Sequence, residues 1–419
     1  MPVKVNAQRV ENDFTALSQI GITPEGGLNR LALSPAHLEA RNWLRERILQ
    51  AGLEFRVDGA GNHSAYLQCG SPGAPTLLLG SHLDSVPNGG KYDGALGVVA
   101  ALEALRRVKE EALQLPFNLE AIDFTDEEGS LVGLLGSFAV AGLLTEEKLD
   151  NSRIGLEAMS ATLQRAGLSR ASVLSARRNP SELAGYLELH IEQGVRLEQT
   201  GAQIGIVTHI PGICSYRLIF LGRADHAGTV PMVDRLDAAM GASAFILAVR
   251  EVLSSEFPDC FANVGQANFE PGAFNIVPER VTLGLEFRST EPKQFSQLEA
   301  RLLASAQYEA GQYGLGFESH FQGRIAPASM DTQIQSAFSA ASDQLGIPWI
   351  SLASRAGHDA QALAMVCPAG MIFVPSVGGS SHSPIEYTRW EDCLNGTNVL
   401  LNAVIQLAQK RQKGKPYHE

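Results

Sequence analysis

The sequence contains few cysteines. It has five in 419 residues, and no two of them form a CxxC pair. A scattered, odd-numbered set lacks the spacing of a structural zinc site or of a disulfide-rich secreted domain. We therefore expect reduced, buried thiols and a cytoplasmic protein.

Long apolar runs and an excess of positive charge are lacking as well. No uninterrupted apolar run reaches the roughly 18 residues needed to cross a membrane. The opening residues, MPVKVNAQRV, lack the apolar core of a signal peptide. The formal net charge is −12, whereas nucleic-acid-binding surfaces are usually basic. We therefore expect neither a membrane nor a nucleic acid as a partner.

The composition is that of an ordinary globular protein, with 45% hydrophobic and 19% charged residues. The chain is too long for one compact core, so two or three domains are expected. Strand and helix patterns alternate: TLLLGSHLD, NLEAIDF and GYLELHI are predicted buried strands, and an Ala-rich helix is predicted over about 94–109. This order predicts an α/β fold with a central mixed sheet.

The pattern changes near Ile213. An alternating strand at YRLIFLGRADHAG, two long helices and further strands form a self-contained α+β segment, after which the α/β style resumes with MIFVPSVGG. The sequence therefore predicts two domains. One is a discontinuous α/β domain formed by 1–213 and 328–419, and the other is an inserted α+β domain over 214–327.

Histidine and acidic side chains follow several predicted strands, where ligands of α/β sheets usually bind. His82 and Asp84 share one face of a strand, so one could bind a metal while the other orients it. A surface His–Asp pair is the alternative. Asp93 lies in a Gly-rich loop, where small residues let the backbone approach closely. It could equally be a helix N-cap.

The acidic motif TDEEG ends another strand. Glu127 and Glu128 are adjacent and point in different directions, so one could bind a metal while the other acts as a general base. A solvated acidic turn is the alternative. His190 ends a further strand and His382 follows a Gly/Ser-rich loop; for each, a buried structural histidine is the alternative. The combined set offers mixed nitrogen and oxygen ligands suited to zinc, manganese or cobalt: His82, Asp93, Glu128, His190 and His382.

Seven motifs occur in order along the chain: GSHLDSVPNGGKYDGALG, TDEEGS, ELHIEQG, GRADHAGTVPM, FNIVP, GHDAQALA and SHSPIEYT. Together they resemble the M20-type metallohydrolases, specifically the hydantoinase/carbamoylase branch with its N-carbamoyl-L-amino-acid hydrolases, β-ureidopropionases and allantoate amidohydrolases. The resemblance covers essentially the whole chain. It implies hydrolysis of a carbamoyl or ureido C–N bond in a small carboxylate substrate. An N-carbamoyl-L-amino acid is favoured, with allantoate, 3-ureidopropionate or ureidoglycolate-type compounds as alternatives.

The resemblance further implies two divalent metal ions per subunit (zinc, or manganese or cobalt). The ligands would form two sets that share Asp93, one of His82, Asp93 and His190 and the other of Asp93, Glu128 and His382. Glu127 would be the general base, and Asp84 would orient His82. His190 distinguishes this branch from the related peptidases, which usually have a carboxylate at that position.

In the family, the inserted domain is a lid that dimerises. His226 would therefore reach the active site of a partner subunit and stabilise an oxyanion; a histidine that stabilises a loop is the alternative. Asn275 and Arg288 would bind the substrate carboxylate with help from Gln193, and Gly357 would line the pocket. The alternating strand ERVTLGLEFRS independently places Arg288 on its polar face, where a guanidinium could bind a carboxylate or simply be exposed.

Two departures from the family pattern bear on the substrate. The stretch before the HAG motif, Gly212–Tyr216, lacks the basic residues of allantoate amidohydrolases, and Leu131-Val132 replace the usual Arg-Phe after the acidic motif. A peptidase and a non-catalytic metal-dependent binding protein are the rival functions. His190 and the short stretch between His82 and Asp93, which is longer in the related peptidases, disfavour the peptidase. The complete ligand set disfavours the binding protein.

Overall fold

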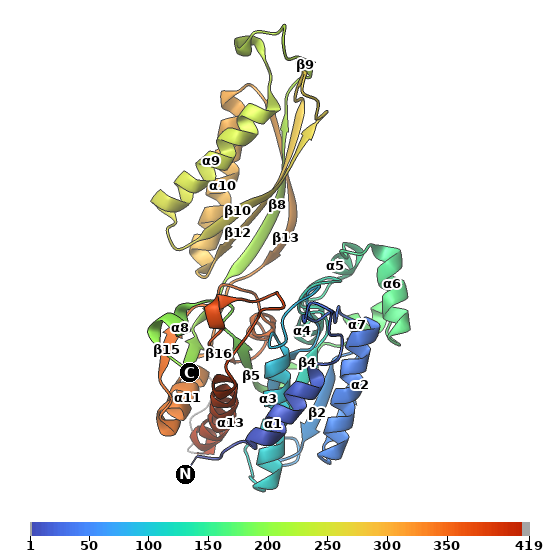
Figure 1. Cartoon of the computed structure of the whole chain (residues 1–419), viewed down its shortest axis with the longest axis vertical. Helices are drawn as coiled ribbons and strands as arrows, with labels where there is room; N and C mark the ends of the chain where they lie inside the picture. The colour runs from blue at the N-terminus through green and yellow to red at the C-terminus, as the bar shows by residue number, and fades with distance from the viewer. Residues whose placement is uncertain (1, 413–419) are drawn as a thin grey trace. The chain divides into compact units, whose positions relative to one another are not determined.

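The computed structural model describes residues 2–412 and divides into two compact units (Figure 1). Unit 1 comprises Met1–Thr208 and Met330–Glu419, and unit 2 comprises His209–Ser329. Unit 2 is slightly longer than the predicted insertion, 214–327. The reason is a pair of short antiparallel strands, β7 (His209–Ile210) and β14 (Ala328–Ser329), which pair with each other where the chain enters and leaves this unit.

Unit 1 is built around an eight-stranded mixed sheet of order β1-β2-β4-β3-β5-β16-β6-β15. Its strands are β1 (Glu54–Val57), β2 (His63–Leu67), β3 (Thr76–His82), β4 (Asn118–Phe124), β5 (Leu183–Ile191), β6 (Ile204–Val207), β15 (Trp349–Leu352) and β16 (Ala369–Val374). The neighbours β4, β3, β5 and β16 run parallel. Nearly all their residues are buried, as expected for the buried strands that the sequence predicted. The predicted α/β fold with a central mixed sheet is confirmed.

Unit 1 also contains several α-helices. They are α1 (Ala7–Leu17), α2 (Pro35–Gln50), α3 (Ala95–Glu110), α4 (Leu135–Ala141), α5 (Glu146–Asp150), α6 (Leu156–Arg165), α7 (Arg170–Leu174), α8 (Arg196–Thr200), α11 (Thr332–Leu345), α12 (Asp359–Leu363) and α13 (Trp390–Gln412). The Ala-rich helix α3 packs against β3, β4 and β5, and α1 and α13 pack on α3. Because alanine is small, α3 can be buried on nearly all sides between these elements. Three short 3₁₀ turns complete the described chain: η1 (Pro180–Glu182) and η3 (Val377–Gly379) in unit 1 and η2 (Met232–Asp234) in unit 2.

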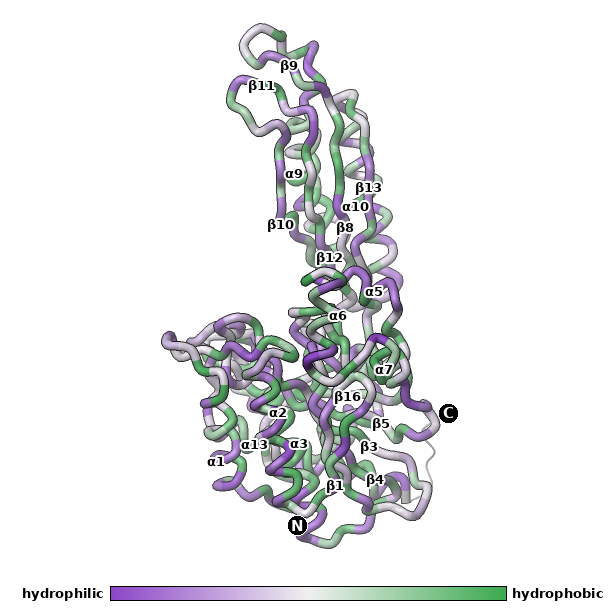
Figure 2. The backbone as a smooth tube through the Cα atoms, turned by 90° about the vertical axis from the view of Figure 1, so that its right-hand side faces the viewer, coloured by the Kyte–Doolittle hydropathy of each residue, from purple (hydrophilic) through white to green (hydrophobic). Residues whose placement is uncertain are grey.

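Unit 2 is a four-stranded antiparallel sheet of order β10-β12-β8-β13 with two long helices. The elements are β8 (Gly212–Leu221), β9 (Asp225–His226), α9 (Ala238–Glu256), β10 (Phe261–Glu270), β11 (Ile276–Val277), β12 (Arg280–Ser289), α10 (Pro292–Gln312) and β13 (Gly316–Ile325). Residues of β12 alternate between buried and less buried, and the buried ones pack with α9 and α10. In Figure 2, hydrophobic and hydrophilic residues both occur along the strands of this unit. Between β10 and β12 the chain contains the short strand β11, which pairs with β9.

Among the described residues, one helix is long and apolar enough to cross a membrane by length and composition alone. It is α9, whose apolar sequence is interrupted by Arg250 and Glu251. Its buried residues, among them Phe245 and Val249, belong to the core of unit 2. Core helices of soluble proteins meet the same criterion, so this feature is weak evidence for a membrane span.

Candidate metal centre

The predicted ligands lie at the carboxyl ends of neighbouring strands. His82 is the last residue of β3, and His190 is the penultimate residue of β5. Glu128 follows β4, and His382 lies in the loop after β16. Because these strands are parallel neighbours, their carboxyl ends meet at one edge of the sheet. Asp93 reaches the same edge from the loop before α3.

The first cluster consists of His82, Asp93 and His190. Their ligand atoms lie within 4.8 Å of one another, and all three residues are buried. The Oδ1 atom of Asp93 is 3.4 Å from Nε2 of His82 and 3.1 Å from Nε2 of His190. The Nδ1 atoms lie close to backbone carbonyls, at 3.0 Å from that of Asp84 and 2.9 Å from that of Ile191. A carbonyl partner calls for a proton on Nδ1, which leaves Nε2 as a ligand atom.

The second cluster consists of Asp93, Glu128 and His382, again with ligand atoms within 4.8 Å of one another. Nε2 of His382 is 3.5 Å from Oδ2 of Asp93 and 3.4 Å from Oε2 of Glu128. Asp93 thus presents one oxygen to each cluster, as a bridging carboxylate does. His382 differs from the other ligands because its side chain is half exposed and its backbone is left-handed, with φ 54°.

Two buried polar atoms in the clusters have no hydrogen-bond partner: Nε2 of His82 and Oε1 of Glu128. Buried polar atoms rarely remain unpaired unless an ion or ligand satisfies them. Burial, and next the charge of Asp93, raise the pKa of Glu128 to about 8. Such crowding of carboxylates is what a bound cation relieves. The residues therefore fit divalent metal ions.

Glu127 lies beside the first cluster without belonging to either one. Its Oε2 is 3.6 Å from Nε2 of His82. Burial raises the pKa of Glu127 well above its ordinary value, and the charges of Asp359 and Glu128 raise it further against the opposing effect of His82. A carboxylate that binds a proton readily, next to two sets of metal ligands, has the position of a general base.

Asp84 and the acidic turn differ from the expectation. Asp84 contacts His82 mainly through its backbone carbonyl, because its carboxylate oxygen is 3.7 Å from the ring nitrogen. That carboxylate accepts hydrogen bonds from the backbone N–H groups of Glu127 and Glu128, at 3.3 and 3.2 Å. The carboxylate therefore holds the turn that carries Glu127 and Glu128, whereas the backbone carbonyl of Asp84 contacts His82. The third carboxylate of the motif, Asp126, accepts four hydrogen bonds within its own turn, which explains how adjacent acids are tolerated.

Two glycines allow close approach around Asp93, as the Gly-rich loop predicted. A Cβ atom on Gly94 would lie 2.5 Å from the ring of His82, and Gly94 has a positive φ of 62°. A Cβ atom on Gly90 would lie 1.9 Å from the carboxylate of Glu386. Any larger residue at either position would displace a side chain of the site.

Further residues of unit 1 surround the clusters. Gln193, a predicted substrate residue, donates a hydrogen bond from Nε2 to Oδ2 of Asp93 at 2.6 Å. Gly357 directly precedes His358, whose ring lies 4.7 Å from that of His190. The sequence-based interpretation missed His358 and Glu386, although both lie in quoted motifs, GHDAQALA and SHSPIEYT. Their place in these motifs was the sequence signal that could have identified them as site residues.

The remaining predicted residues belong to unit 2. His226 is exposed in β9, and its Nδ1 accepts a hydrogen bond from the backbone N–H of Gly228. Asn275 is its neighbour, because the Asn275 carbonyl accepts a hydrogen bond from the next residue after His226. Arg288 lies at the other end of β12, ion-paired with Glu286 at 2.8 Å.

One subunit cannot bind a single small carboxylate through both Asn275 and Arg288. From Arg280, which follows closely after β11, to Arg288 the strand rises roughly 27 Å. Within unit 2, Asn275 therefore groups with His226 and not with Arg288. The predicted joint role of Asn275 and Arg288 in binding a carboxylate stays a prediction, and it requires the two residues to come from different subunits.

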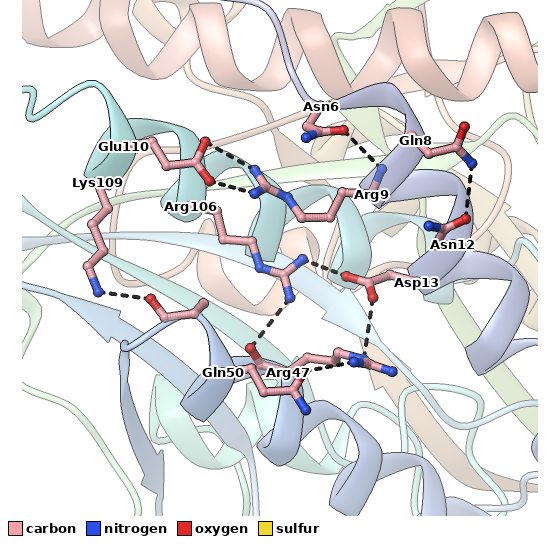
Figure 3. Close-up of a pocket in the computed structure, with 11 residues that line it drawn as sticks. Asn6, Gln8, Arg9, Asn12, Asp13, Arg47, Gln50, Arg106, Lys109 and Glu110 are labelled. Atoms are coloured by element: carbon pink, nitrogen blue, oxygen red, sulfur yellow. Dashed lines mark hydrogen bonds and ion pairs between the residues drawn. The ribbon is translucent and has the colours of Figure 1, made fainter.

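A pocket of about 880 Å³ lies elsewhere in unit 1, between α1, α2 and α3 (Figure 3). Its charged groups are paired with one another: Arg9 binds Glu110, Arg106 binds Asp13, and Lys109 donates to the carbonyl of Ala51. None of the predicted site residues lines it. We interpret this network as a structural connection among three helices.

The sequence matches peptidase family M20/M25/M40 over residues 78–406. The chain belongs to this family. It is 36% identical over 407 residues to the N-carbamoyl-L-amino acid amidohydrolase of Geobacillus stearothermophilus, with 97% of this chain and 99% of that protein covered. It is 34% identical over 399 residues to the allantoate amidohydrolase of Bacillus subtilis, with 94% and 95% covered.

A crystal structure also matches over nearly the whole length. It is an amidase of the hydantoinase/carbamoylase family from Burkholderia multivorans, with a TM-score of 0.85, 32% identity, and 97% of this chain and 98% of that chain covered. The predicted M20 family and its hydantoinase/carbamoylase branch are confirmed. Family membership and the two ligand clusters together indicate divalent metal ions.

Proposed function

We propose that this protein is a metal-dependent amidohydrolase that cleaves the carbamoyl C–N bond of an N-carbamoyl-L-amino acid. The observation that carries the proposal is the pair of ligand clusters sharing Asp93, with Glu127 beside them. Full-length similarity to the N-carbamoyl-L-amino acid amidohydrolase of G. stearothermophilus supports the substrate class. The products would be an L-amino acid, ammonia and carbon dioxide.

The centre would hold two divalent ions, zinc or else manganese or cobalt. One would be held by His82, Asp93 and His190, and the other by Asp93, Glu128 and His382. Nitrogen and carboxylate oxygen ligands suit these metals. When bound, the ions would lower the pKa of a water molecule and polarise the carbamoyl carbonyl.

Glu127 would move the proton. Its carboxylate takes a proton from the attacking water and later delivers it to the leaving nitrogen. The raised pKa of Glu127 favours the first transfer. Asp84 supports this role because it fixes the backbone of the turn that carries Glu127.

The substrate carboxylate would be bound by Arg288 with help from Gln193. Arg288 would exchange its present partner, Glu286, for the substrate. His226 and Asn275 would come from a second subunit, because they lie at the opposite end of unit 2 from Arg288. His226 would donate a hydrogen bond to the developing oxyanion. Unit 2 would thus serve as a lid and as the contact of a homodimer.

The cysteines support a cytoplasmic location. All five are buried and form no disulfide. Reduced thiols are usual in that compartment.

A substrate panel tests the proposed function. Metal-stripped protein is reconstituted with zinc, manganese or cobalt, and ammonia release is measured with N-carbamoyl-L-amino acids, their D-enantiomers, allantoate, 3-ureidopropionate and ureidoglycolate. We expect the highest kcat/KM with an N-carbamoyl-L-amino acid and no turnover without metal. Faster release from allantoate would move the assignment to that substrate, which the B. subtilis relative makes the second candidate. In a parallel assay of amino-acid release from dipeptides, cleavage faster than that of the N-carbamoyl substrates would show a peptidase.

A further inference from the structure

Glu386 joins two loops of the metal centre that are far apart in sequence. Its Oε1 accepts hydrogen bonds from the backbone N–H groups of Tyr92 and Asp93, at 2.8 and 3.1 Å. Its Oε2 accepts one from the hydroxyl of Ser381 at 2.9 Å. The carboxylate is only 5% exposed, and it fits there because Gly90 has no side chain.

Ser381 adds a second connection. Its hydroxyl oxygen lies 3.1 Å from Oδ2 of Asp93. The segment 381–386 thus contacts Asp93 at its backbone, through Glu386, and at its carboxylate, through Ser381. His382 is the residue immediately after Ser381, so the same contacts determine where this ligand stands.

The three histidine ligands differ in the contacts that hold them in place. His82 and His190 stand in β3 and β5, and each is 1% exposed, so the sheet itself fixes them. His382 stands in a loop, is half exposed and has a left-handed backbone. Its position therefore depends on the contacts of segment 381–386 far more than the positions of the other two histidines do.

We propose that Glu386 is a positioning residue that holds segment 381–386 against the loop of Asp93 and thereby sets the metal affinity of the Asp93–Glu128–His382 cluster. The proposal rests on the two-ion centre of the proposed function. Hydrogen-bonding partners of metal ligands commonly change metal affinity by about 10–100-fold when they are removed. The loss should fall mainly on one of the two ions, because His382 belongs to one cluster only, whereas the shared ligand Asp93 is also held by a hydrogen bond from Gln193.

The test is a zinc titration of the full-length, metal-stripped protein in competition with a chromophoric chelator. We expect two equivalents in the wild type. In Glu386→Ala one zinc equivalent, that of the Asp93–Glu128–His382 cluster, should lose about 10–100-fold in affinity. The affinity of the other zinc equivalent should change by less than about threefold. Glu386→Gln should restore most of the affinity, because its amide oxygen can still accept from the two backbone N–H groups and its NH₂ group can donate to Ser381.

Three further variants make the comparison independent of general destabilisation. Ser381→Ala removes one connection and should weaken the same equivalent by a smaller factor. Gly90→Ala should reproduce Glu386→Ala, since the added Cβ atom overlaps the carboxylate. Glu198→Ala is the matched control: this carboxylate also accepts a backbone N–H, that of Gly378, but contacts no ligand residue, so zinc binding should not change.

Hydrogen–deuterium exchange of the metal-free proteins gives a second measurement. Peptides containing Tyr92 and Asp93 should exchange faster in Glu386→Ala than in the wild type or in Glu198→Ala. Should Glu386→Ala not fold, Ser381→Ala and Glu386→Gln decide the matter. If Glu386→Ala bound both zinc equivalents with wild-type affinity, this inference would be overturned and the proposed function would stay intact. If Glu386→Ala does not fold, wild-type zinc affinity in Ser381→Ala has the same meaning. A wild type that binds fewer than two ions would overturn the two-ion centre and this inference with it.

Discussion

Glu127 and Glu128 are adjacent residues with different surroundings. Oε2 of Glu128 lies 3.4 Å from His382, within a ligand cluster, whereas Glu127 faces His82 at 3.6 Å and belongs to neither cluster. The backbone of both is held by one carboxylate, that of Asp84. A turn fixed in this way can direct one side chain to a metal and the other to the reacting water.

Replacement of Glu127 by glutamine separates these roles. Glu127→Gln keeps the shape of the side chain but cannot accept the proton from water. We expect kcat to fall by about 10²–10⁴-fold with metal content unchanged, measured by ammonia release and by elemental analysis. The control, Glu128→Gln, should lose metal as well. A near-normal kcat in Glu127→Gln would refute its role as the base.

His37 links stability to pH. It is fully buried, its Nδ1 accepts the backbone N–H of Leu33, and burial together with the charge of Arg41 holds its pKa well below 6.5. The folded protein therefore keeps His37 neutral while the unfolded chain protonates it below about pH 6.5. Unfolding then takes up a proton, so the free energy of unfolding should decrease as the pH falls below that value, by up to about 1.4 kcal/mol per pH unit for this group.

The variant His37→Asn tests this linkage. An asparagine side-chain oxygen can still accept the Leu33 N–H, but it does not titrate. The free energy of unfolding, measured with urea at pH 7 and pH 5.5, should fall less between these values in the variant than in the wild type. Other histidines titrate in both proteins, so their effects cancel in the difference. Equal pH dependence would contradict the assignment.

At the scale of elements, the strands that carry the ligands could be predicted and the contacts between their loops could not. A continuous apolar run identified β3, whereas β4 and β5 were identified as mainly apolar segments that end in acidic or other polar residues. The role of the Asp84 carboxylate depends on how the loop after β3 meets the loop after β4. The contact of Glu386 with Asp93 spans 293 residues. Such pairings follow from tertiary packing and leave no local pattern.

Glu103 shows how one polar residue can connect two elements. It interrupts the apolar sequence of α3 and is only 1% exposed. Its carboxylate accepts hydrogen bonds from the backbone N–H of Asn6, at 2.8 Å, and from the guanidinium of Arg9. Helix α1 is thereby joined to α3 at its first turn.

Glu103→Ala should therefore loosen α1. Removal of one partner from a buried ion pair usually costs 3–5 kcal/mol, but Arg9 is 27% exposed and retains Glu110, so we expect a loss of about 2 kcal/mol in the free energy of unfolding. Glu111→Ala is the control: this exposed carboxylate directly follows α3 and pairs with Arg107 of that helix, so its loss should matter by less than about 0.5 kcal/mol. Equal stability of the two variants in urea denaturation would contradict the connection.

At the scale of the whole molecule, the two units have separate cores. That of unit 1 includes Leu79 and Leu189, and that of unit 2 includes Leu283 and Phe245. The change from α/β to α+β patterns predicted such a division because it requires two differently built cores. The predicted bounds, 214–327, missed only the short β7–β14 pair. Two strands of two residues each offer too little periodicity to be recognised in a sequence.

Metal removal should therefore affect one unit and not the other. All the proposed ligands lie in unit 1, and a ligand present at 100 times its Kd adds about 2.7 kcal/mol of stability to the unit that binds it. In differential scanning calorimetry we expect two transitions, and a chelator should lower one of them by roughly 5 °C or more while the other, that of unit 2, stays in place. Glu128→Gln, with one cluster broken, should show a smaller shift, whereas Glu111→Ala should show the full one. A chelator that shifted neither transition, or both equally, would mean that the ions do not bind selectively to folded unit 1.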